Sequence, residues 1–201
     1  SDMLTFFIAL EGLDEIGRLH GYEIMDQTLC ALSEYIQQLS ELPLTLLGVW
    51  STDKWVLLYD RGQHGFSIEQ IAQRLIKAIQ DPVQIKQWSV HVRARIGVSG
   101  VKTERTPEQV VRMAAVALPA ADNQWQAYDQ VLEEALRRKN QLSDALHTAV
   151  DNHELYLQYQ PKVDVRTGQV RGAEALLRWN SPVFGRVSPA EFIPIAEANC
   201  L

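Results

Sequence analysis

The stretch "VRGAEALLRWNSP", from Val170 to Pro182, places charged residues inside an apolar run typical of a β-strand. We expect Glu174 to lie in a buried strand, four residues before Arg178. A carboxylate where water is scarce needs a cation, a metal ion or several hydrogen-bond donors. In a strand, Glu174 and Arg178 share one face at a separation of about 13 Å, too far for a salt bridge. The stretch therefore predicts separate partners for the two residues. A strand end with two solvated charges is the alternative.

Composition indicates a globular protein without a nucleic-acid partner. The chain has 201 residues, 46% hydrophobic and 22% charged, enough for one large domain or one domain and part of another. The net charge of -6 lacks the basic footprint of nucleic-acid binding. No apolar run reaches the roughly 18 residues of a membrane span and no signal peptide opens the chain, so we expect a cytoplasmic location. Membrane attachment would have to come from missing upstream segments. Both ends fall inside periodic patterns, which favours a piece of a longer protein.

Residues 1–129 predict a first domain of the α/β (α+β) class. Strand-like and helix-like patterns alternate there, so helices should pack on a mostly antiparallel sheet. Pro43 should end the helix that precedes it, and Ser67 and Thr106 should cap two later helices. The expected elements, in order, are strand Leu4–Gly12, helix Tyr22–Leu39, strands Leu44–Trp50 and Lys54–Asp60, helix Ser67–Gln80, strand Trp88–Val101, helix Pro107–Leu118 and strand Gln124–Asp129.

Residues 130–152 predict a linker helix, and residues 153–201 a hairpin followed by a helix. In the linker helix, Glu133 and Glu134 stand at the spacing that pairs them with Arg137 and Arg138. Two strand patterns then flank the turn residues "RTGQ". The last helix should begin at Pro189 with Ser188 as its cap.

Three segments of this last part resemble the opening of an EAL domain: Tyr159–Lys162, Glu174–Trp179 and Ser188–Pro194. EAL domains hydrolyse, or only bind, cyclic di-GMP, and their fold is a TIM-like barrel of which this chain holds the N-terminal part. The resemblance implies that Glu174 binds a catalytic Mg²⁺ or Mn²⁺, that Arg178 meets a phosphate of the ligand, and that Gln160 and Leu177 line its pocket. We expect the metal only in the complete domain. This chain should bind cyclic di-GMP weakly or not at all, and no catalytic residue is expected in it.

Residues 4–129 resemble a GGDEF domain, the family that makes cyclic di-GMP from GTP, but without its catalytic groups. The resemblance places Ala9 at the first metal-binding aspartate, Glu11 at a nearby acidic position and Gly17 at a guanine-reading asparagine. The inhibitory site would fall at residues 42–45 and is absent. Asp26 is kept. The signature loop is replaced by Ser51, Thr52, Asp53, Lys54 and Trp55. Losing metal ligands removes charge stabilisation that phosphoryl chemistry needs, so the resemblance implies an inactive cyclase.

The sequence thus predicts a regulatory or dimerising module that controls an attached EAL domain. Two alternatives stay open: the full-length parent is an active cyclic di-GMP phosphodiesterase, or it is a non-catalytic receptor for cyclic di-GMP or GTP. A hairpin with unpaired edges predicts docking or a homodimer, through the hairpin or through helices. Trp50 and Trp55 favour core anchors, whereas exposure of either would indicate a partner surface.

Overall fold

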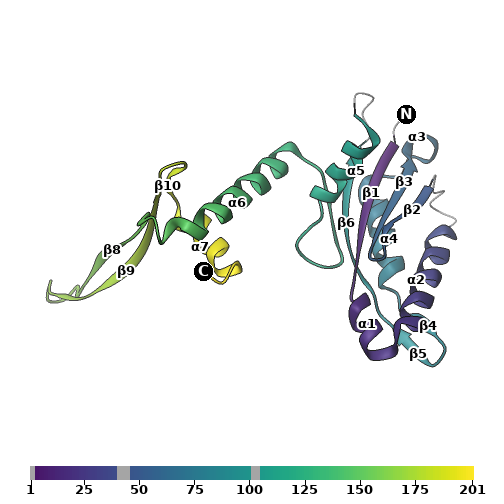
Figure 1. Cartoon of the computed structure of the whole chain (residues 1–201), viewed down its shortest axis with the longest axis horizontal. Coiled ribbons are helices and arrows are strands. Elements are labelled where there is room, and N and C mark those ends of the chain that lie inside the picture. Colours follow the sequence, from purple (N-terminus) through teal and green to yellow (C-terminus); the bar gives the residue numbers. More distant parts are fainter. Residues whose placement is uncertain (1–2, 40–45, 101–104) are drawn as a thin grey trace. The chain divides into compact units, whose positions relative to one another are not determined.

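The computed structural model describes residues 3–39, 46–100 and 105–201, apart from the side chains of residues 63 and 64. The chain divides into two compact units, Ser1–Glu133 and Glu134–Leu201 (Figure 1). The predicted Pro43 helix end and the predicted inhibitory site at residues 42–45 lie outside the described residues.

A five-stranded sheet in the order β2-β3-β1-β6-β7 forms the centre of the first unit. All neighbouring strands are antiparallel except β6 and β7, which run parallel. The predicted antiparallel-rich α/β class is therefore confirmed. The strands are β1 (Met3–Glu11), β2 (Leu46–Ser51), β3 (Lys54–Asp60), β6 (Arg93–Gly100) and β7 (Gln124–Ala127).

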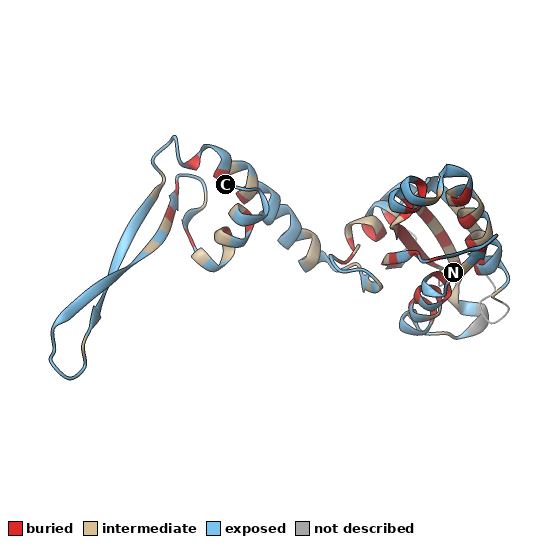
Figure 2. Cartoon of the chain, turned by 90° about the horizontal axis from the view of Figure 1, so that it is seen from below, coloured by how far each residue is buried: buried red, intermediate tan, exposed pale blue. Residues whose placement is uncertain are grey.

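Helices cover both faces of this sheet (Figure 2). Alternate residues of β1, such as Phe6 and Ile8, enter one core with α1, α2 and α4. On the opposite face Gly97 lies against α5, because a Cβ there would come 1.9 Å from the Ala114 carbonyl oxygen. Ser67 and Thr106 each form the predicted capping box. The helices are α1 (Leu13–His20), α2 (Tyr22–Gln37), α3 (Arg61–His64), α4 (Ile68–Gln80) and α5 (Pro107–Val116).

The helix predicted for Tyr22–Leu39 is found as α2, but the structure adds α1, which the sequence did not predict. Gly21, with a φ of 93°, separates the two helices, because this backbone conformation ends a right-handed helix. The single strand predicted for Trp88–Val101 is wrong. A small hairpin of β4 (Val83–Ile85) and β5 (Trp88–Val90) turns at Lys86, whose φ is 54°, and β6 begins separately at Arg93.

The second unit contains the remaining elements around a small core. Its three-stranded antiparallel sheet has the order β10-β9-β8. Trp179 is fully buried, packs edge-on against Phe192 at 5.6 Å between ring centroids, and donates to Glu154 over 2.9 Å. Ser188 makes no side-chain capping hydrogen bond, contrary to the prediction, although Pro189 opens the helix as expected. The elements are α6 (Gln130–Ala149, which starts in the first unit), β8 (Leu155–Val163), β9 (Val170–Ser181), β10 (Gly185–Val187) and α7 (Pro189–Ala198).

Candidate functional site

The end of β1 and the β2–β3 turn bring together several of the predicted cyclase positions. Ala9 is paired with Lys54 on β3 and with Arg95 on β6. The Leu10 amide donates to the Asp53 carbonyl oxygen over 2.7 Å, which holds the turn against β1. Trp55 lies in the core with 3% exposure and anchors the start of β3. The turn is therefore fixed, but the strand beside it presents a methyl group where the resemblance implies a carboxylate.

Asp53 is fully engaged by its neighbours in this turn. Ser51 donates to its Oδ1 over 2.8 Å, and Lys54 Nζ donates to its Oδ2 over 2.7 Å. The hydrogen bond from Lys54 holds the pKa of the Asp53 carboxyl below its usual range. At neutral pH the carboxylate is ionised and its charge is balanced within the turn. Thr52, beside it, has a side chain at a position where the resemblance implies a glycine.

Glu11, the second expected acidic position, is engaged in the same way. Arg95 donates to Glu11 Oε1 from Nε over 2.9 Å and from a terminal nitrogen over 2.5 Å. Arg95 also donates to the Pro119 carbonyl oxygen over 3.2 Å, which fixes the guanidinium. The sequence did not predict Arg95 as the partner of Glu11, because only the register of β1 on β6 brings the two together, and local patterns do not give that register.

These groups do not fit a divalent metal ion. Each of the two carboxylates already has a cation, and the position between Lys54 and Arg95 is Ala9. Within the described residues, no group of three or more His, Cys, Asp or Glu side chains is arranged to hold a metal. Mg²⁺ binds through oxygen ligands in near-octahedral geometry, so a cation-filled turn is a poor site for it.

Gly17, at the expected guanine-reading position, is covered by side chains of the following helix, α2. It is buried in α1, and a Cβ there would meet the Tyr22 ring at 3.1 Å and the Met25 sulfur at 3.6 Å. Asp26, the acidic residue kept from the family pattern, lies exposed on α2. An amide side chain at Gly17 would require the Tyr22 ring to move.

The β8–β9 hairpin carries the residues expected to bind cyclic di-GMP. Gln160 lies directly opposite Glu174, and Glu174 Oε2 forms an ion pair with Lys162 at 3.3 Å. Arg178 donates to Gln158 over 2.9 Å, so Glu174 and Arg178 contact different neighbours. Leu177 lies beside them, about one-third exposed.

The prediction that Glu174 is buried is wrong, because its side chain is 52% exposed. An apolar run predicts burial only if other elements cover it, and most of β8 and β9 is exposed within the described part of the chain. Glu174 thus contributes one exposed carboxylate, which by itself does not hold a metal ion.

Comparison with known proteins assigns both parts of the chain. Residues 1–128 match the family model described as "Diguanylate cyclase, GGDEF domain", and residues 140–201 match the EAL domain. The chain belongs to the GGDEF family and continues into an EAL domain. This is the domain architecture of cyclic di-GMP signalling proteins.

Curated relatives share this arrangement over nearly the whole chain. Cyclic di-GMP phosphodiesterase PA2567 of Pseudomonas aeruginosa is 32% identical over 195 residues, which cover 94% of this chain and 33% of the relative. The bifunctional diguanylate cyclase/cyclic di-GMP phosphodiesterase MucR of the same species is 28% identical over an alignment that covers 98% of this chain and 29% of the relative. The biofilm architecture maintenance protein MbaA of Vibrio cholerae is 29% identical over an alignment that covers 98% of this chain and 26% of the relative. This GGDEF–EAL chain thus spans about a third or less of their lengths.

Solved GGDEF structures share the fold of the first unit. The isolated GGDEF domain of YfiN from Pseudomonas aeruginosa superposes with a TM-score of 0.57 at 19% identity, covering 68% of this chain and 82% of that structure. The active GGEEF domain of a diguanylate cyclase from Vibrio cholerae superposes with a TM-score of 0.54 at 16% identity, covering 65% of this chain and 85% of that structure. The sheet order and helix layers described above are therefore those of a GGDEF domain.

A three-residue cluster joins the GGDEF domain to the start of α6. Glu133, in the first turn of α6, accepts from Arg112 on α5 over 2.8 Å and from the Tyr128 hydroxyl. Glu133 raises the pKa of both the Arg112 guanidinium and the Tyr128 phenol. The spacing predicted pairs of Glu133 and Glu134 with Arg137 and Arg138. In the structure Glu133 accepts from Arg112, and Arg138 donates to Glu191 on α7 over 2.5 Å.

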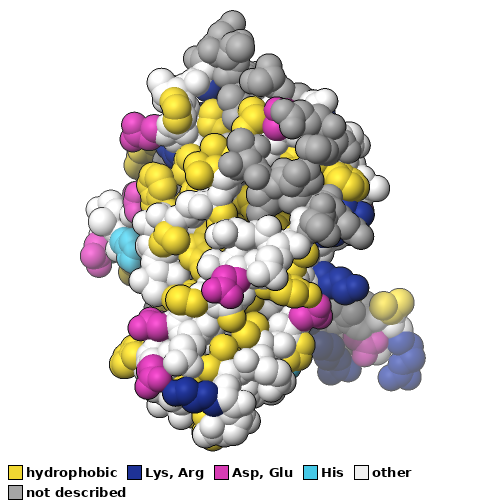
Figure 3. All heavy atoms as spheres, turned by 90° about the vertical axis from the view of Figure 1, so that its right-hand side faces the viewer, with side chains coloured by type: hydrophobic (Ala, Val, Ile, Leu, Met, Phe, Trp, Pro, Cys, Tyr) yellow, Lys and Arg dark blue, Asp and Glu magenta, His cyan; other side chains and the backbone are white. Residues whose placement is uncertain are grey.

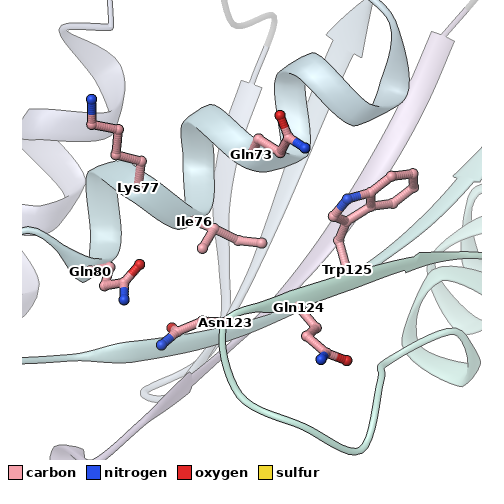
Figure 4. A pocket seen from close by; sticks show the side chains of 7 residues that line it. All are labelled: Gln73, Ile76, Lys77, Gln80, Asn123, Gln124 and Trp125. Atoms are coloured by element: carbon pink, nitrogen blue, oxygen red, sulfur yellow. The ribbon is translucent and has the colours of Figure 1, made fainter.

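The described residues of the GGDEF domain line two cavities of about 400 Å³ each. One lies between α4 and the β7 edge and is lined by carboxamides, Lys77 and the half-buried Trp125 (Figure 4). In Figure 4 Lys77 points away from the strand, so its charge does not converge with the carboxamides. The other lies between the sheet and α5 and is almost wholly apolar.

The edge strand β2 exposes apolar side chains. Leu46, Val49 and Trp50 are 55%, 73% and 62% exposed, and Trp50 makes an edge contact with Phe7 at 6.4 Å. Figure 3, viewed from the side of α2 and β2, shows hydrophobic side chains scattered between acidic and basic ones. Of the two tryptophans around the turn, Trp55 is the core anchor and Trp50 the exposed one. No helix among the described residues is long and apolar enough to cross a bilayer.

Proposed function

We propose that the GGDEF domain of this chain is inactive as a cyclase and regulates the attached EAL domain through contact. The observation that carries the proposal is the state of the two carboxylates at the end of β1 and in the β2–β3 turn. Glu11 is paired with Arg95 and Asp53 with Lys54, and Ala9 stands between the two cations.

Electrostatics explains why this arrangement opposes GTP turnover. Phosphoryl transfer depends on metal ions and positioned charges that stabilise the transition state. A metal at the turn would have to displace Lys54 and Arg95 from charge-assisted hydrogen bonds, which are stronger than neutral ones. The Tyr22 ring over Gly17 removes, in addition, the space for a side chain that would read guanine.

For the EAL part, we propose that the full-length parent is a cyclic di-GMP phosphodiesterase located in the cytoplasm. The similarity to a relative named as a cyclic di-GMP phosphodiesterase supports this. In the complete domain Glu174 would be one ligand of Mg²⁺ or Mn²⁺, Arg178 would contact a phosphate, and Gln160 and Leu177 would line the pocket. In this chain the ammonium group of Lys162 is the positive charge beside Glu174, where the complete domain would hold the metal ion.

The exposed hairpin also supports a homodimer, either through β8–β9 or through helices. Leu157, Tyr159 and Val170 are each more than half exposed on it. An exposed strand pair with apolar side chains is a template for pairing with another chain.

A cyclase assay tests the central proposal. The purified chain, given GTP with Mg²⁺ or Mn²⁺, should form no cyclic di-GMP, and calorimetry at millimolar GTP should show no heat of binding. Formation of cyclic di-GMP would refute the regulatory reading. GTP binding without turnover would favour the receptor alternative instead. The full-length parent, assayed with cyclic di-GMP, should hydrolyse it, and Glu174→Gln should abolish the activity.

A further inference from the structure

The apolar cavity between the sheet and α5 is a site that the proposed function does not use. Its walls come from β1, β2 and β3 on one side and from the first half of α5 on the other. α5 packs along β6 and β1 (Figure 1). At about 400 Å³ the cavity falls in the size range of small-molecule sites, and such sites are mostly apolar with a few placed polar groups.

Apart from Thr5 and Arg105, the described residues that line this cavity are all apolar or glycine. Arg105 is half-buried at the start of α5 and forms no ion pair or hydrogen bond within the described residues. A guanidinium beside an apolar cavity fits a ligand with an anionic head group, because it can donate two parallel hydrogen bonds to a carboxylate. The lining and the charge together select an amphiphilic anion rather than a purely apolar or a polar ligand.

The same cavity wall is connected to α6. Val110 and Val111 face the cavity, and the next residue, Arg112, donates to Glu133 in the first turn of α6. The charge of Arg105 also acts on the phenol of Tyr128, the other partner of Glu133. A ligand that shifts α5 or neutralises Arg105 would therefore alter how the start of α6 is held.

We propose that this cavity binds a medium-chain carboxylate, with its aliphatic chain between the sheet and α5 and its carboxylate on Arg105. Binding alters the Arg112–Glu133–Tyr128 cluster and so reaches the helix that leads to the EAL domain. The regulatory consequence rests on the proposed function, whereas the binding does not.

Calorimetry with decanoate, kept below its micelle-forming concentration, tests the binding on this chain. Saturable binding with one site is expected. Arg105→Gln should weaken it about tenfold, since a hydrogen bond to a charged group is lost. Decan-1-ol should bind more weakly than decanoate by a similar factor. Lys77→Gln, at the other cavity, should leave decanoate binding unchanged.

A cavity-filling variant tests the location. Gly48 lines the cavity, and a Cβ there would meet only the Val56 carbonyl oxygen at 3.8 Å, an ordinary contact. Gly48→Leu should therefore fold normally, as checked by its unfolding curve, and lose decanoate binding. Undiminished binding in Gly48→Leu, equal affinity for decan-1-ol, or no saturable binding would each overturn the proposal.

Hydrogen exchange tests the connection to α6. In the wild type, decanoate should change amide exchange in α5 and in the first turns of α6. In the Arg112→Gln variant it should change exchange in α5 alone. If the amides at the start of α6 respond equally in Arg112→Gln, the connection is refuted. Cyclase activity would refute the proposed function but would not affect the proposal that decanoate binds. The failure of one proposal is therefore distinguishable from the failure of the other.

Discussion

Replacing Gly97 by alanine should strongly destabilise the GGDEF domain. The added Cβ would lie 1.9 Å from the Ala114 carbonyl oxygen, 2.9 Å from the Leu118 nitrogen and 3.0 Å from the Ala114 carbonyl carbon. All three atoms belong to backbone, so no side-chain rotation relieves the contact. α5 would have to move away from β6 by more than 1 Å to restore an ordinary contact. Overpacking of this kind costs roughly 1–3 kcal/mol, and we expect the upper end, about 3 kcal/mol.

Urea unfolding followed by tryptophan fluorescence measures this loss. Trp50, Trp55, Trp88 and Trp125 lie in the first unit and only Trp179 in the second, so the signal mainly reports the GGDEF domain. A loss of about 3 kcal/mol is a large part of the roughly 5–15 kcal/mol that stabilises an ordinary domain.

Gly100→Ala is the matched control for Gly97→Ala. It lies on the same strand, and a Cβ there meets nothing within 4 Å. Its effect should stay within about 0.5 kcal/mol, as for exposed sites. If the two variants unfold at the same urea concentration, the close approach of α5 to β6 is refuted.

Three further predictions concern other contacts. Tyr59 is fully buried and its hydroxyl has no hydrogen-bond partner among the described residues, so Tyr59→Phe should leave the urea midpoint unchanged or raise it. Lys54 lowers the pKa of Asp53, so this pair contributes stability above the unfolded pKa of about 3.9, and the contribution is lost as pH falls through the lower folded pKa. Lys54→Met should therefore reduce the urea midpoint at pH 7, and the difference from the wild type should vanish once the pH lies below the folded pKa of Asp53; a constant gap at all pH values would contradict this. Glu133→Gln should lower the pKa of Tyr128, measured by NMR of the tyrosine ring carbons, and an unchanged titration would show that Glu133 does not hold the phenol.

The sequence predicted those parts of the fold that depend on neighbours along the chain. Each capping box, at Ser67 and at Thr106, joins residues only three positions apart, so the starts of α4 and α5 could be predicted from the local sequence. The helix α1 was missed, because it has only eight residues and buries three of them, too few for a clear helical period.

The sites depended more on distant residues and were less predictable. Glu11 and Arg95 are 84 positions apart, and a one-residue change of register would turn Arg95 to the other face. For Glu174 the strand and its hairpin followed from the pattern, but its exposure and its position opposite Gln160 did not. Burial depends on what covers a strand, and a strand's own sequence does not contain that information.

The residues that oppose metal binding and the α5 cavity lie toward different ends of β1. Ala9 and Asp53 lie at one end of β1, where only a turn and strand ends are affected. Thr5, four residues earlier and about 13 Å along the strand, lies at the end where the α5 cavity forms. Because the core between them is continuous from Leu4 to Leu10, changes at the turn need not disturb α5. The hydrogen bond from Arg112 to Glu133 involves none of the residues in the turn, so the regulation by contact that we propose does not depend on a nucleotide there.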